Sequence, residues 1–495
     1  MKKQLLNTIL NNIKRLGDKN SFFINNQFYT YSDFSKRIAG INQLLKKQNI
    51  TTQTAVGVIT NDCIETYASI VSLWLNGFIF IPISPSNSKE RNENSIIQAN
   101  IKYLLTANSN DAMIIETNNL TIIETVAATS ENKLINNNHL PNNILYILFT
   151  SGSTGIPKGV PITLANLESF IYSFINLGYQ LDEHDRFLQI YDLSFDASVH
   201  CYTLPLFVGG CTYTVPTNEI KYLYAYKLIK EQELTFVKMP PSTITYLQPY
   251  FHKINLEKLR YTLFGGEALP LNLAKQWKKC AINSEIHNVY GPTEATINCF
   301  YFQITPPIKN VNEIVCIGQP IGDTIVLVLD ENQTILAAHQ KGELCLSGTQ
   351  ITKGYWKNPQ KNKTAFVKII YHNKQITFYK TGDLVYFDDD NDYYFCGRID
   401  NQVQIQGYRV ELGEIEYHAR IKTKKNYVVA MSVQKNGIQQ LYLFIENYTD
   451  SIKELKKFLE DKLPNYMVPQ HIINIEQFPV LTSGKIDRNK LKELI

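Results

Sequence analysis

The sequence predicts an α/β fold: a large N-terminal α/β region with a small β-barrel-like subdomain, then a small α+β C-terminal domain. Three observations support this prediction. Helix-like and strand-like segments alternate from the N-terminus, which is typical of an α/β core. From about Ile314, short strand-like runs are separated by turn residues, which indicates an antiparallel sheet or small barrel. After Asp400 the pattern changes again, and roughly 95 residues remain, a plausible size for a domain.

The N-terminal residues predict an amphipathic helix rather than a signal peptide. A signal peptide needs a continuous apolar core, but here the apolar residues are interrupted by Asn7, Asn11 and Asn12. A second helix follows, for which Ser32 is the expected N-cap. Apolar residues recur near helical spacing along it, at Phe34, Ile38, Ile41 and Leu45.

Short apolar runs further along predict buried strands, at Ala55–Ile59 and Ile144–Phe149. The longest apolar run, Ala68–Ile83, is interrupted by polar and turn residues and falls short of the ~20 apolar residues that span a bilayer. It therefore predicts a buried helix followed by a buried strand. Asn136–Asn138 is expected to lie in a surface loop.

The antiparallel part is expected to contain strands at Ile325–Leu329, Glu343–Leu346 and Tyr393–Cys396. The last of these follows a polar turn at Asp388–Asp392. Beyond it, Ser451-x-x-Glu454 is a capping-box pattern that predicts a helix. The apolar stripe of that helix is expected at Ile452, Leu455, Phe458 and Leu459.

These patterns divide the chain at Asp400. Residues 1–400 are expected to form the N-terminal core, and residues 401–495 the C-terminal domain.

Composition excludes several classes of protein. The 495 residues are 44% hydrophobic and 19% charged, which excludes a mostly disordered chain, a coiled coil and a collagen. The formal charge is 49 − 45 = +4, which gives no reason to expect nucleic acid or a membrane as the main partner. Eight cysteines without a CxxC pair suit a reducing compartment, so a cytoplasmic location is expected.

The strongest chemical signal is the segment Phe149-Thr-Ser-Gly-Ser-Thr-Gly-Ile-Pro-Lys-Gly159, directly after a predicted strand. Its glycines let backbone N–H groups turn toward an anion, its hydroxyls add donors, and Lys158 adds positive charge. This is the chemistry of a phosphate-binding loop, although it is not a Walker A motif, because no Gly-Lys-Ser/Thr occurs. The alternative is a flexible linker, which the preceding strand and the Pro-Lys-Gly ending disfavour.

This segment resembles the signature loop of the adenylate-forming superfamily, which includes peptide synthetase adenylation domains, amino acid–carrier protein ligases, acyl- and aryl-CoA ligases and luciferases. The resemblance extends over nearly the whole chain, because further motifs follow in the family's order. They are Asn288-Val-Tyr-Gly-Pro-Thr-Glu294, Tyr379-Lys-Thr-Gly-Asp383, Gly397-Arg-Ile-Asp-Asn401, Gly407-Tyr-Arg-Val-Glu-Leu-Gly-Glu414, Leu463-Pro-Asn-Tyr-Met-Val-Pro469 and Ser483-Gly-Lys-Ile-Asp-Arg488.

The resemblance implies that ATP and Mg²⁺ are the cofactors. The ATP-binding residues it implies are Thr150, Ser151, Gly152, Ser153, Thr154, Gly155, Lys158, Gly266, Glu267, Asn288, Tyr290, Gly291, Thr293, Asp383, Arg398 and Lys485. Within this set, Tyr290 would stack on adenine, Asp383 would bind the ribose and Arg398 the nucleotide. On residue type alone, they could equally be a core tyrosine, a turn aspartate and a surface cation.

Three residues are expected to carry the chemistry: Lys485, Glu294 and Thr150. Glu294 is the expected Mg²⁺ ligand, since magnesium prefers hard oxygen ligands, although a carboxylate also suits a helix start. By the resemblance, Lys485 is a mobile catalytic lysine that bridges the substrate carboxylate and the α-phosphate. Without the resemblance, it would be a solvated loop lysine.

Asp400 is the hinge position in the family, about which the mobile C-terminal domain rotates between adenylation and transfer. Nearby, Gln404 and Gln406 stand where related enzymes often carry Lys and Arg. This departure weakens the case for a basic docking contact for the second substrate.

The segment Leu193-Ser-Phe-Asp-Ala-Ser-Val-His200 resembles the start of the acyl pocket in amino-acid-activating members. The aspartate in this pattern, here Asp196, binds the α-ammonium of the substrate, a charge-assisted contact. The alternative is a structural aspartate near a helix start. The same comparison places nine residues around the substrate: Asp196, Ala197, His200, Lys238, Leu263, Gly265, Val289, Ile297 and Asn298.

Lys238 is the most informative of these residues. A buried lysine is costly unless it is paired, so a pocket-facing Lys238 would indicate a substrate with a polar or acidic side chain. The alternative is that Lys238 extends to solvent or pairs with a protein carboxylate.

The sequence therefore predicts a stand-alone amino-acid adenylating ligase that loads the phosphopantetheine thiol of a separate carrier protein. It stops seven residues after Arg488, with no carrier domain following. One alternative is an acyl- or aryl-CoA ligase that uses coenzyme A as acceptor. The other is a non-catalytic nucleotide-binding protein of the same fold.

Overall fold

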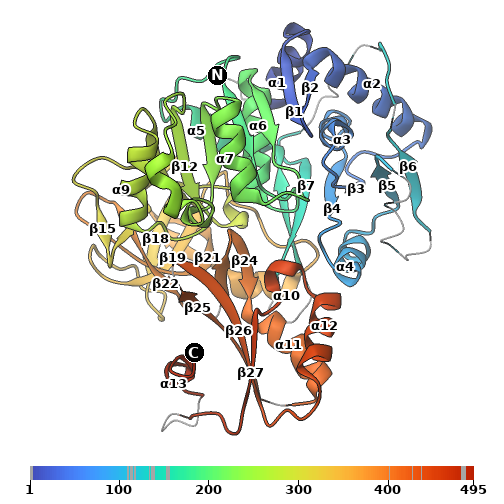
Figure 1. Cartoon of the computed structure of the whole chain (residues 1–495). Helices are drawn as coiled ribbons and strands as arrows, with labels where there is room; N and C mark the ends of the chain where they lie inside the picture. Colours follow the sequence, from blue (N-terminus) through green and yellow to red (C-terminus); the bar gives the residue numbers. More distant parts are fainter. Residues whose placement is uncertain are drawn as a thin grey trace.

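The structure is a computed structural model (Figure 1). It describes residues 4–108, 111, 115, 119–126, 128–132, 134, 140–151, 157–400, 402–425, 427–435, 437–480 and 486–495. Among these residues, no helix has both the length and the apolar character needed to cross a bilayer.

The largest element is a nine-stranded sheet of order β17-β14-β13-β12-β11-β9-β10-β1-β2. The six strands from β13 to β1 in this order pair in parallel. The edge strand β2 at one end, and β14 and the edge strand β17 at the other, are joined by antiparallel pairs. The strands are β1 (Asn20–Ile24), β2 (Gln27–Thr30), β9 (Arg186–Gln189), β10 (Cys211–Thr214), β11 (Phe236–Met239), β12 (Tyr261–Gly265), β13 (Glu285–Tyr290), β14 (Phe300–Gln303) and β17 (Gln319–Pro320). Parallel strands of this kind are buried on both faces, which explains their continuous apolar runs.

A second, six-stranded sheet has the order β6-β5-β3-β4-β7-β8 and is parallel except for the β7–β8 pair. Its strands are β3 (Ala55–Ile59), β4 (Ile79–Ile83), β5 (Tyr103–Thr106), β6 (Thr121–Glu124), β7 (Ile144–Thr150) and β8 (Lys158–Thr163). The antiparallel return from β7 to β8 matters for function, because the glycine-rich loop connects these two strands.

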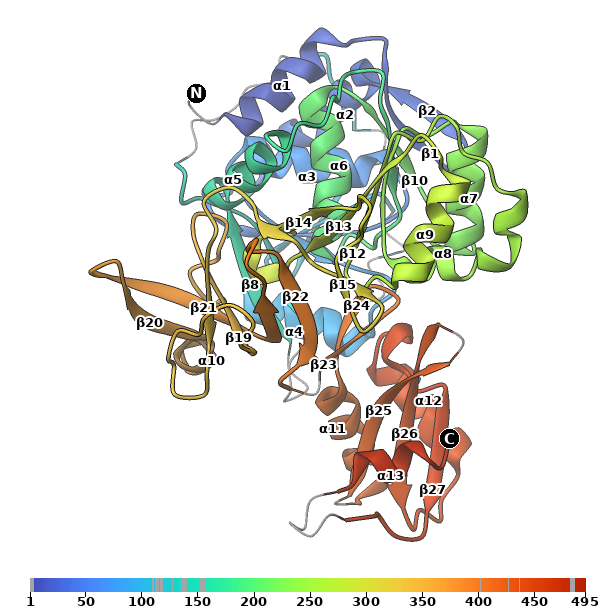
Figure 2. The same cartoon turned by 90° about the vertical axis from the view of Figure 1, so that its left-hand side faces the viewer.

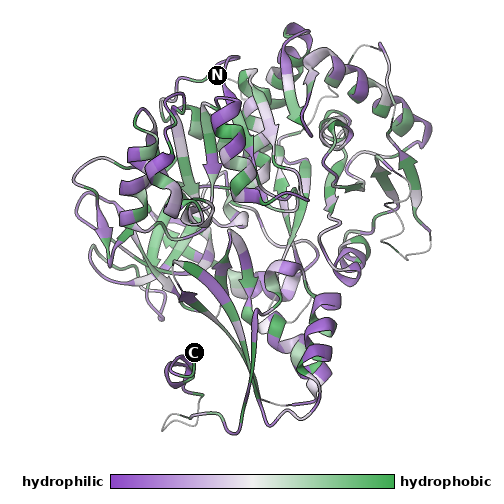
Figure 3. Ribbon diagram, viewed as in Figure 1, coloured by the Kyte–Doolittle hydropathy of each residue, from purple (hydrophilic) through white to green (hydrophobic). Residues whose placement is uncertain are grey.

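Helices cover both sheets. They are α1 (Leu5–Arg15), α2 (Tyr31–Lys47), α3 (Ile64–Leu75), α4 (Lys89–Ala99), α5 (Leu164–Ile175), α6 (Asp196–Val208), α7 (Lys221–Glu231), α8 (Pro241–Thr245), α9 (Leu271–Cys280), η2 (Gln248–Lys253) and η3 (Thr293–Ala295). One apolar cluster joins residues of α1, α2, α3, α5 and α6 to strands of both sheets. Figure 3 shows the consequence: the strands are largely green, whereas the outer faces of α9 and α12 are purple.

The antiparallel part forms a five-stranded sheet. Four of its strands have the order β18-β19-β21-β20, and the fifth, β22, also pairs with β21. Its strands are β18 (Ile325–Leu329), β19 (Gly342–Ser347), β20 (Phe366–Tyr371), β21 (Lys374–Phe387) and β22 (Tyr393–Arg398), with α10 (Pro359–Ala365) beside them. A two-stranded ribbon, β15 (Asn310–Val311) and β16 (Ile314–Val315), precedes this sheet.

The C-terminal elements begin with the hairpin β23 (Gln402–Ile405) and β24 (Tyr408–Glu411). A three-stranded sheet follows, in which β25 (Val428–Lys435) and β26 (Ile438–Glu446) pair antiparallel and β27 (His471–Ile475) pairs parallel to β26. The helices are α11 (Leu412–Thr423), α12 (Ile452–Lys462), α13 (Arg488–Lys492) and the short η4 (Asn465–Met467). These elements lie below the rest of the molecule, with α12 packed against α4 (Figures 1 and 2).

The predicted elements are confirmed, including the buried helix–strand pair formed by α3 and β4. Two predicted details are wrong. The N-cap of α2 is Thr30 rather than Ser32, because the Thr30 and Asp33 side chains each bond the other's backbone N–H. In α12, Ser451 is the cap, but Ile452 is 41% exposed, so it does not belong to the buried stripe. The predicted Asn136–Asn138 loop lies outside the described residues.

Candidate nucleotide and acyl site

The ends of the glycine-rich loop are held together by the β7–β8 pair. Thr150 and Lys158 are direct partners in this ladder, and the Thr150 hydroxyl donates to the Lys158 carbonyl at 3.4 Å. Ser151 is buried, and its hydroxyl donates to the Arg409 carbonyl at 3.0 Å. Gly152, Ser153, Thr154 and Gly155 lie outside the described residues.

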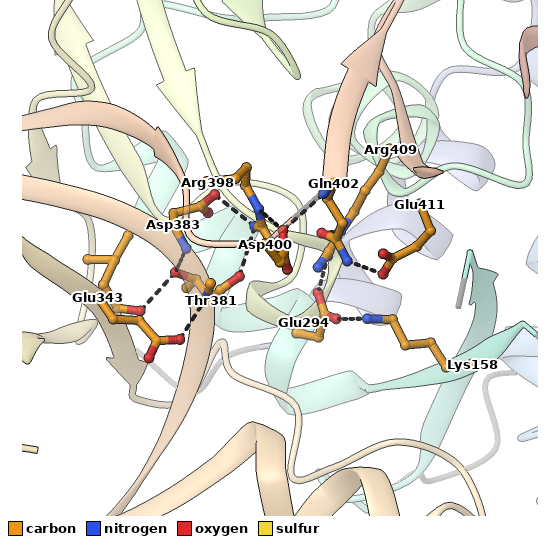
Figure 4. A network of polar contacts seen from close by, with 12 residues as sticks. Lys158, Glu294, Glu343, Thr381, Asp383, Arg398, Asp400, Gln402, Arg409 and Glu411 are labelled. Atoms are coloured by element: carbon orange, nitrogen blue, oxygen red, sulfur yellow. Dashed lines mark hydrogen bonds and ion pairs between the residues drawn. The ribbon is translucent and has the colours of Figure 1, made fainter. Parts of the chain in front are cut away.

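Glu294 is fully buried next to this loop, on η3. One carboxylate oxygen accepts from the Tyr355 hydroxyl at 2.7 Å and lies 3.6 Å from the Lys158 ammonium. The other oxygen accepts from the Arg409 guanidinium at 2.8 Å (Figure 4). Burial alone would raise the pKa of Glu294, but Arg409 and Lys158 hold it well below its usual range.

The same surroundings favour the charged form of Glu294 but disfavour the charged form of Lys158. Burial and the neighbouring Arg409 lower the pKa of its ammonium to about 8, although Glu294 opposes this shift. Two cations thus converge on one carboxylate.

A cavity of about 540 Å³ lies beside this cluster and is lined by seven of the eleven predicted nucleotide residues that the structure describes. Those that line it are Gly266, Glu267, Asn288, Tyr290, Gly291, Asp383 and Arg398, together with Asp400. Thr293 is not among the lining residues and lies instead near Asp196. Residues of the C-terminal strands β25 and β26 complete the wall.

Within this cavity, Asp383 is held from two sides. The Tyr290 hydroxyl donates to one of its oxygens, and the Arg398 guanidinium donates to the other at 2.7 Å. Burial raises the pKa of Asp383, while Arg398 lowers it. Glu267 has different partners, the backbone N–H groups of Ser242 and Gly407 at 2.9 and 2.7 Å.

The predicted acyl residues meet at the carboxyl ends of β11, β12 and β13, the usual ligand-binding edge of a parallel sheet. In these ladders Lys238 is the partner of Leu263, and Gly265 is the partner of Val289. The remaining members come from the first turns of α6 and from the segment after η3: Asp196, Ala197, His200, Ile297 and Asn298. Asp196 is the first residue of α6, and burial raises the pKa of its carboxyl to about 6, although Lys238 and Thr293 oppose the shift.

Lys238 does not extend to solvent, since only 2% of the residue is exposed. Its ammonium donates to the side-chain amide oxygen (Oδ1) of Asn298 at 2.5 Å, and burial lowers its pKa to about 8. His200 is also buried, and neither of its ring nitrogens has a hydrogen-bond partner among the described residues. Burial lowers its pKa far below the usual value, so the imidazole is neutral. The ring packs against Phe170, Phe174 and Phe236.

Lys485 lies outside the described residues. The residues that flank it, Val480 and Ile486, form a β-bridge, and Arg488 beyond them donates to the Ala430 carbonyl of β25 at 2.8 Å. At the predicted hinge, the Asp400 carboxylate accepts from Arg398 at 2.9 and 2.6 Å and from the Gln402 N–H at 3.0 Å.

Sequence reasoning missed two residues of the Glu294 cluster, Arg409 and Tyr355. Arg409 belongs to the Gly407–Glu414 motif, but the motif by itself predicts no role for the arginine. No motif marks Tyr355. A second cavity of about 330 Å³ was also unforeseen. Its walls combine residues near α6, α7 and α8 with the β23–β24 hairpin, and include Tyr191, Phe195, Lys221, Tyr246, Gly407 and Tyr408.

Comparison with known proteins identifies the class. The chain belongs to the family of AMP-binding enzymes, whose family model matches residues 10–356. It is 29% identical to gramicidin S synthase 1 of Brevibacillus brevis, over 94% of this chain and 42% of that protein. It is 28% identical to tyrocidine synthase 1 of Brevibacillus parabrevis, over 96% of this chain and 44% of that protein. The chain thus spans less than half the length of these relatives.

Solved structures agree with this assignment and confirm the resemblance to the adenylate-forming superfamily. The adenylation domain AlmE of Vibrio cholerae, solved with glycyl-adenosine-5'-phosphate, superposes with a TM-score of 0.89 at 25% identity, over 100% of this chain and 98% of that chain. The o-succinylbenzoate CoA synthetase MenE of Bacillus subtilis shares the fold, with a TM-score of 0.82 at 17% identity and 98% of each chain covered. The predicted α/β fold class is thereby confirmed.

Proposed function

We propose that this protein activates an amino acid with ATP to aminoacyl-AMP and pyrophosphate, and then transfers the aminoacyl group to the phosphopantetheine thiol of a separate carrier protein. The observation that carries the proposal is the position of Asp196. It lies at the start of α6, near Thr293 of the nucleotide motif and Lys238 of the acyl residues. A carboxylate at this junction can hold the α-ammonium while the substrate carboxylate points toward ATP.

The nucleotide would occupy the 540 Å³ cavity. Tyr290 offers a ring face for adenine, Asp383 offers acceptors for the ribose hydroxyls, and Lys158 and the residues of the glycine-rich segment are proposed to bind the phosphates. The substrate carboxylate oxygen attacks the α-phosphorus and pyrophosphate leaves. No general base is needed, since the carboxylate is ionised near neutral pH. Lys485 is proposed to stabilise the charge that develops between the two reactants.

Glu294 is proposed to hold Mg²⁺. It is a hard oxygen ligand buried beside the phosphate loop, and magnesium on nucleotides is typically held by one or two carboxylates, phosphate oxygens and water. When bound, the metal supplies charge neutralisation for the leaving pyrophosphate. The donor set therefore fits the metal, provided that one carboxylate oxygen is released from its present partner.

The side chain of the amino acid is proposed to be polar or acidic. Lys238 is buried, and its hydrogen-bond partner among the described residues is the neutral Asn298. A buried ammonium is stabilised when it gains an anion or further acceptors. The unpartnered nitrogens of His200 could also serve a polar group, because a buried polar atom without a partner is costly.

The 330 Å³ cavity supports a thiol acceptor. It lies between the N-terminal helices and the β23–β24 hairpin, and its walls include Tyr191 and Phe195, which precede Asp196 in the chain. A cavity of this volume with partly aromatic walls suits a pantetheine arm. The alternative acceptor is coenzyme A, which carries the same arm.

The first experiment is ATP–pyrophosphate exchange with a panel of L- and D-amino acids, aryl acids and fatty acids. Exchange with an amino acid supports the proposal, whereas exchange only with acids that lack an α-amine would show that the protein is an acyl- or aryl-CoA ligase. Loading of a separately supplied carrier protein, compared with coenzyme A, then identifies the acceptor. Lys485→Ala should abolish exchange, and absence of exchange with every acid would indicate a non-catalytic protein.

A further inference from the structure

The segment that follows Glu294 has a strained backbone. Thr296 and Ile297 have φ values of +55° and +77°, in the left-handed region that β-branched residues rarely adopt. Both residues are buried, with 0% and 2% of their surface exposed, so this is not a surface turn. A conformation of this kind persists only where the surrounding structure determines it. Contacts from elsewhere in the chain must therefore hold these two residues.

The contacts come from Gln350, which follows β19 and has no exposed surface. Its side-chain Nε2 donates to the backbone carbonyl of Ala295 at 3.2 Å and to that of Asn298 at 2.8 Å. Its own backbone carbonyl accepts from the Thr296 hydroxyl. One residue thus binds the strained pair from both sides.

Gln350 is itself fixed by α5. The side-chain amide of Asn166, on that helix, donates to the backbone carbonyls of Thr349 and Ile351 at 2.6 and 3.3 Å. The side-chain Oε1 of Gln350 is buried and has no hydrogen-bond partner among the described residues. A buried acceptor without a partner is costly, so the side-chain amide stabilises the fold through its N–H donors.

The segment that Gln350 holds carries two of the proposed acyl residues, Ile297 and Asn298. The side-chain oxygen of Asn298 accepts from the Lys238 ammonium at 2.5 Å. On its other side the segment has little room, because a Cβ added at Gly291 would lie 2.6 Å from the Cα of Asn298. A change in the backbone conformation of this segment would therefore move Asn298 relative to Lys238.

We propose that Gln350 is a positioning residue for selection of the substrate side chain. It holds residues 295–298 in their strained conformation and thereby fixes the Lys238–Asn298 pair at the acyl site. Without its side-chain amide, the segment relaxes toward negative φ, the pair separates, and side chains of different length and charge are distinguished less well. The inference rests on the proposed function, because it takes the acyl site to lie at Asp196 and Lys238.

The first test is pyrophosphate exchange by Gln350→Leu, which removes the N–H donors but keeps a side chain of similar size. The probes are the L- and D-forms of the standard amino acids, with succinate and benzoate as acids that lack an α-amine. We expect the ratio of kcat/KM between the best and second-best probe to fall about 10-fold, since contacts in such pockets discriminate by about 10- to 200-fold. The KM of the best probe should rise, whereas the KM of ATP should stay the same.

The matched control is Gln53→Leu. The Nε2 of Gln53 also donates to two backbone carbonyls, those of Gly77 and Ile144 at 3.1 and 3.3 Å, but Ile144 begins β7 at the end away from Thr150. This variant loses the same kind of contact and should keep the parent selectivity. If Gln350 were merely structural, the two glutamine variants would not differ in selectivity.

The double variant Thr296→Gly/Gln350→Leu tests whether strain is the reason. Glycine adopts a positive φ without steric cost, so the segment no longer depends on Gln350 to the same extent. The double variant should therefore regain part of the selectivity that Gln350→Leu loses.

Hydrogen exchange supplies a readout that does not depend on activity. Without nucleotide, residues 293–299 should exchange their amide hydrogens faster in Gln350→Leu than in the parent chain, and at the parent rate in Gln53→Leu. If Gln350→Leu has no cooperative unfolding transition, Gln350→Asn takes its place. That variant keeps an amide on a shorter side chain, and both readouts should change in the same direction by less.

Unchanged hydrogen exchange in residues 293–299, or an unchanged selectivity ratio, would overturn the inference and leave the proposed function intact. Faster hydrogen exchange, with weaker discrimination between succinate and benzoate and no activity with any amino acid, would support the positioning role and contradict the proposed function. A parent chain that is active with none of the probes would overturn both.

Discussion

At the scale of single residues, two opposing effects act on the ionisation of the Asp196 carboxyl. As the first residue of α6 it lies where the helix dipole favours a carboxylate, yet burial raises its pKa to about 6. An ammonium is bound only by the ionised form. We therefore predict that the KM of the amino acid in pyrophosphate exchange rises as the pH falls through about 6, by up to tenfold per pH unit, while the KM of ATP does not follow it.

The variant Asp196→Asn should raise the amino-acid KM by about 10- to 100-fold, the size of a charge-assisted contact, and should remove its pH dependence below 6. The KM of ATP serves as the internal control, because the nucleotide motifs are unchanged. Equal losses for both substrates would show that Asp196 is structural.

Lys238 allows a second prediction, in which substrate binding weakens as the pH rises instead of as it falls. Burial lowers its pKa to about 8, so its ammonium is present below that pH and is lost above it. A substrate carboxylate at Lys238 should therefore bind more weakly as the pH rises through about 8. Lys238→Met should remove that dependence and shift the preference in an exchange panel toward apolar amino acids. If the selectivity of this variant were unchanged, Lys238 would not contact the side chain of the substrate.

The sequence predicted the roles of residues that lie inside motifs better than contacts between residues of different motifs. Asp383 and Arg398 were both expected at the nucleotide, and they are hydrogen-bonded to each other on neighbouring strands. Arg409 reaches Glu294 across 115 positions of sequence. That contact depends on how the C-terminal elements lie on the rest of the molecule, which no local pattern encodes.

At the scale of elements, periodicity identified the helices and strands, but the helix ends depended on single hydrogen bonds. Thr30 and Ser32 are both plausible caps of α2, and the choice falls on Thr30 because Asp33 is three residues beyond it and completes a capping box. In α12, Ile452 lies in the first turn, where it does not reach the core formed by Leu455 and Leu459. The pattern of apolar residues alone does not predict which turn of a helix extends beyond the neighbouring element and is exposed to solvent.

At the scale of elements, a prediction concerns the turn of the β23–β24 hairpin. Its turn residue Gly407 has φ +81°, and an added Cβ would lie 3.2 Å from the Pro240 side chain. Gly407→Ala should therefore strain the turn and push the hairpin away from the N-terminal part. We expect thiol transfer to fall at least tenfold, with pyrophosphate exchange retained, when the two half-reactions are measured separately.

The control for this variant is Gly178→Ala. Gly178 also has a positive φ, +95°, but an added Cβ would meet no atom within 4 Å. It should cause local strain without changing the ratio of transfer to exchange. If Gly407→Ala impaired both half-reactions equally, the hairpin would not be specific to transfer.

At the scale of the whole molecule, buried apolar residues separate on either side of position 400. Among the described residues, four clusters contain buried members only from the part before Asp400, and two contain them only from the part after it. The contacts that cross between the parts include ion pairs, such as Arg91–Glu414, Lys462–Glu90 and Arg409–Glu294. Aromatic contacts also cross, such as Phe195 against Tyr408. Separate cores joined by an interface that includes ion pairs are typical of domains that move relative to each other.

We therefore propose the boundary at Asp400 and predict that a fragment of residues 1–400 folds cooperatively. It should still bind the Mg²⁺ complex of a non-hydrolysable ATP analogue, because the residues proposed to hold the nucleotide, Asp383 and Arg398 among them, belong to this fragment. It should nevertheless lose pyrophosphate exchange by about 100-fold or more, since Lys485 is absent and removal of one such charge-stabilising group costs two to three orders of magnitude. Calorimetry and exchange assays on the same preparation measure both properties. A fragment without a cooperative unfolding transition would contradict the boundary, and one with full exchange would contradict the catalytic role of Lys485.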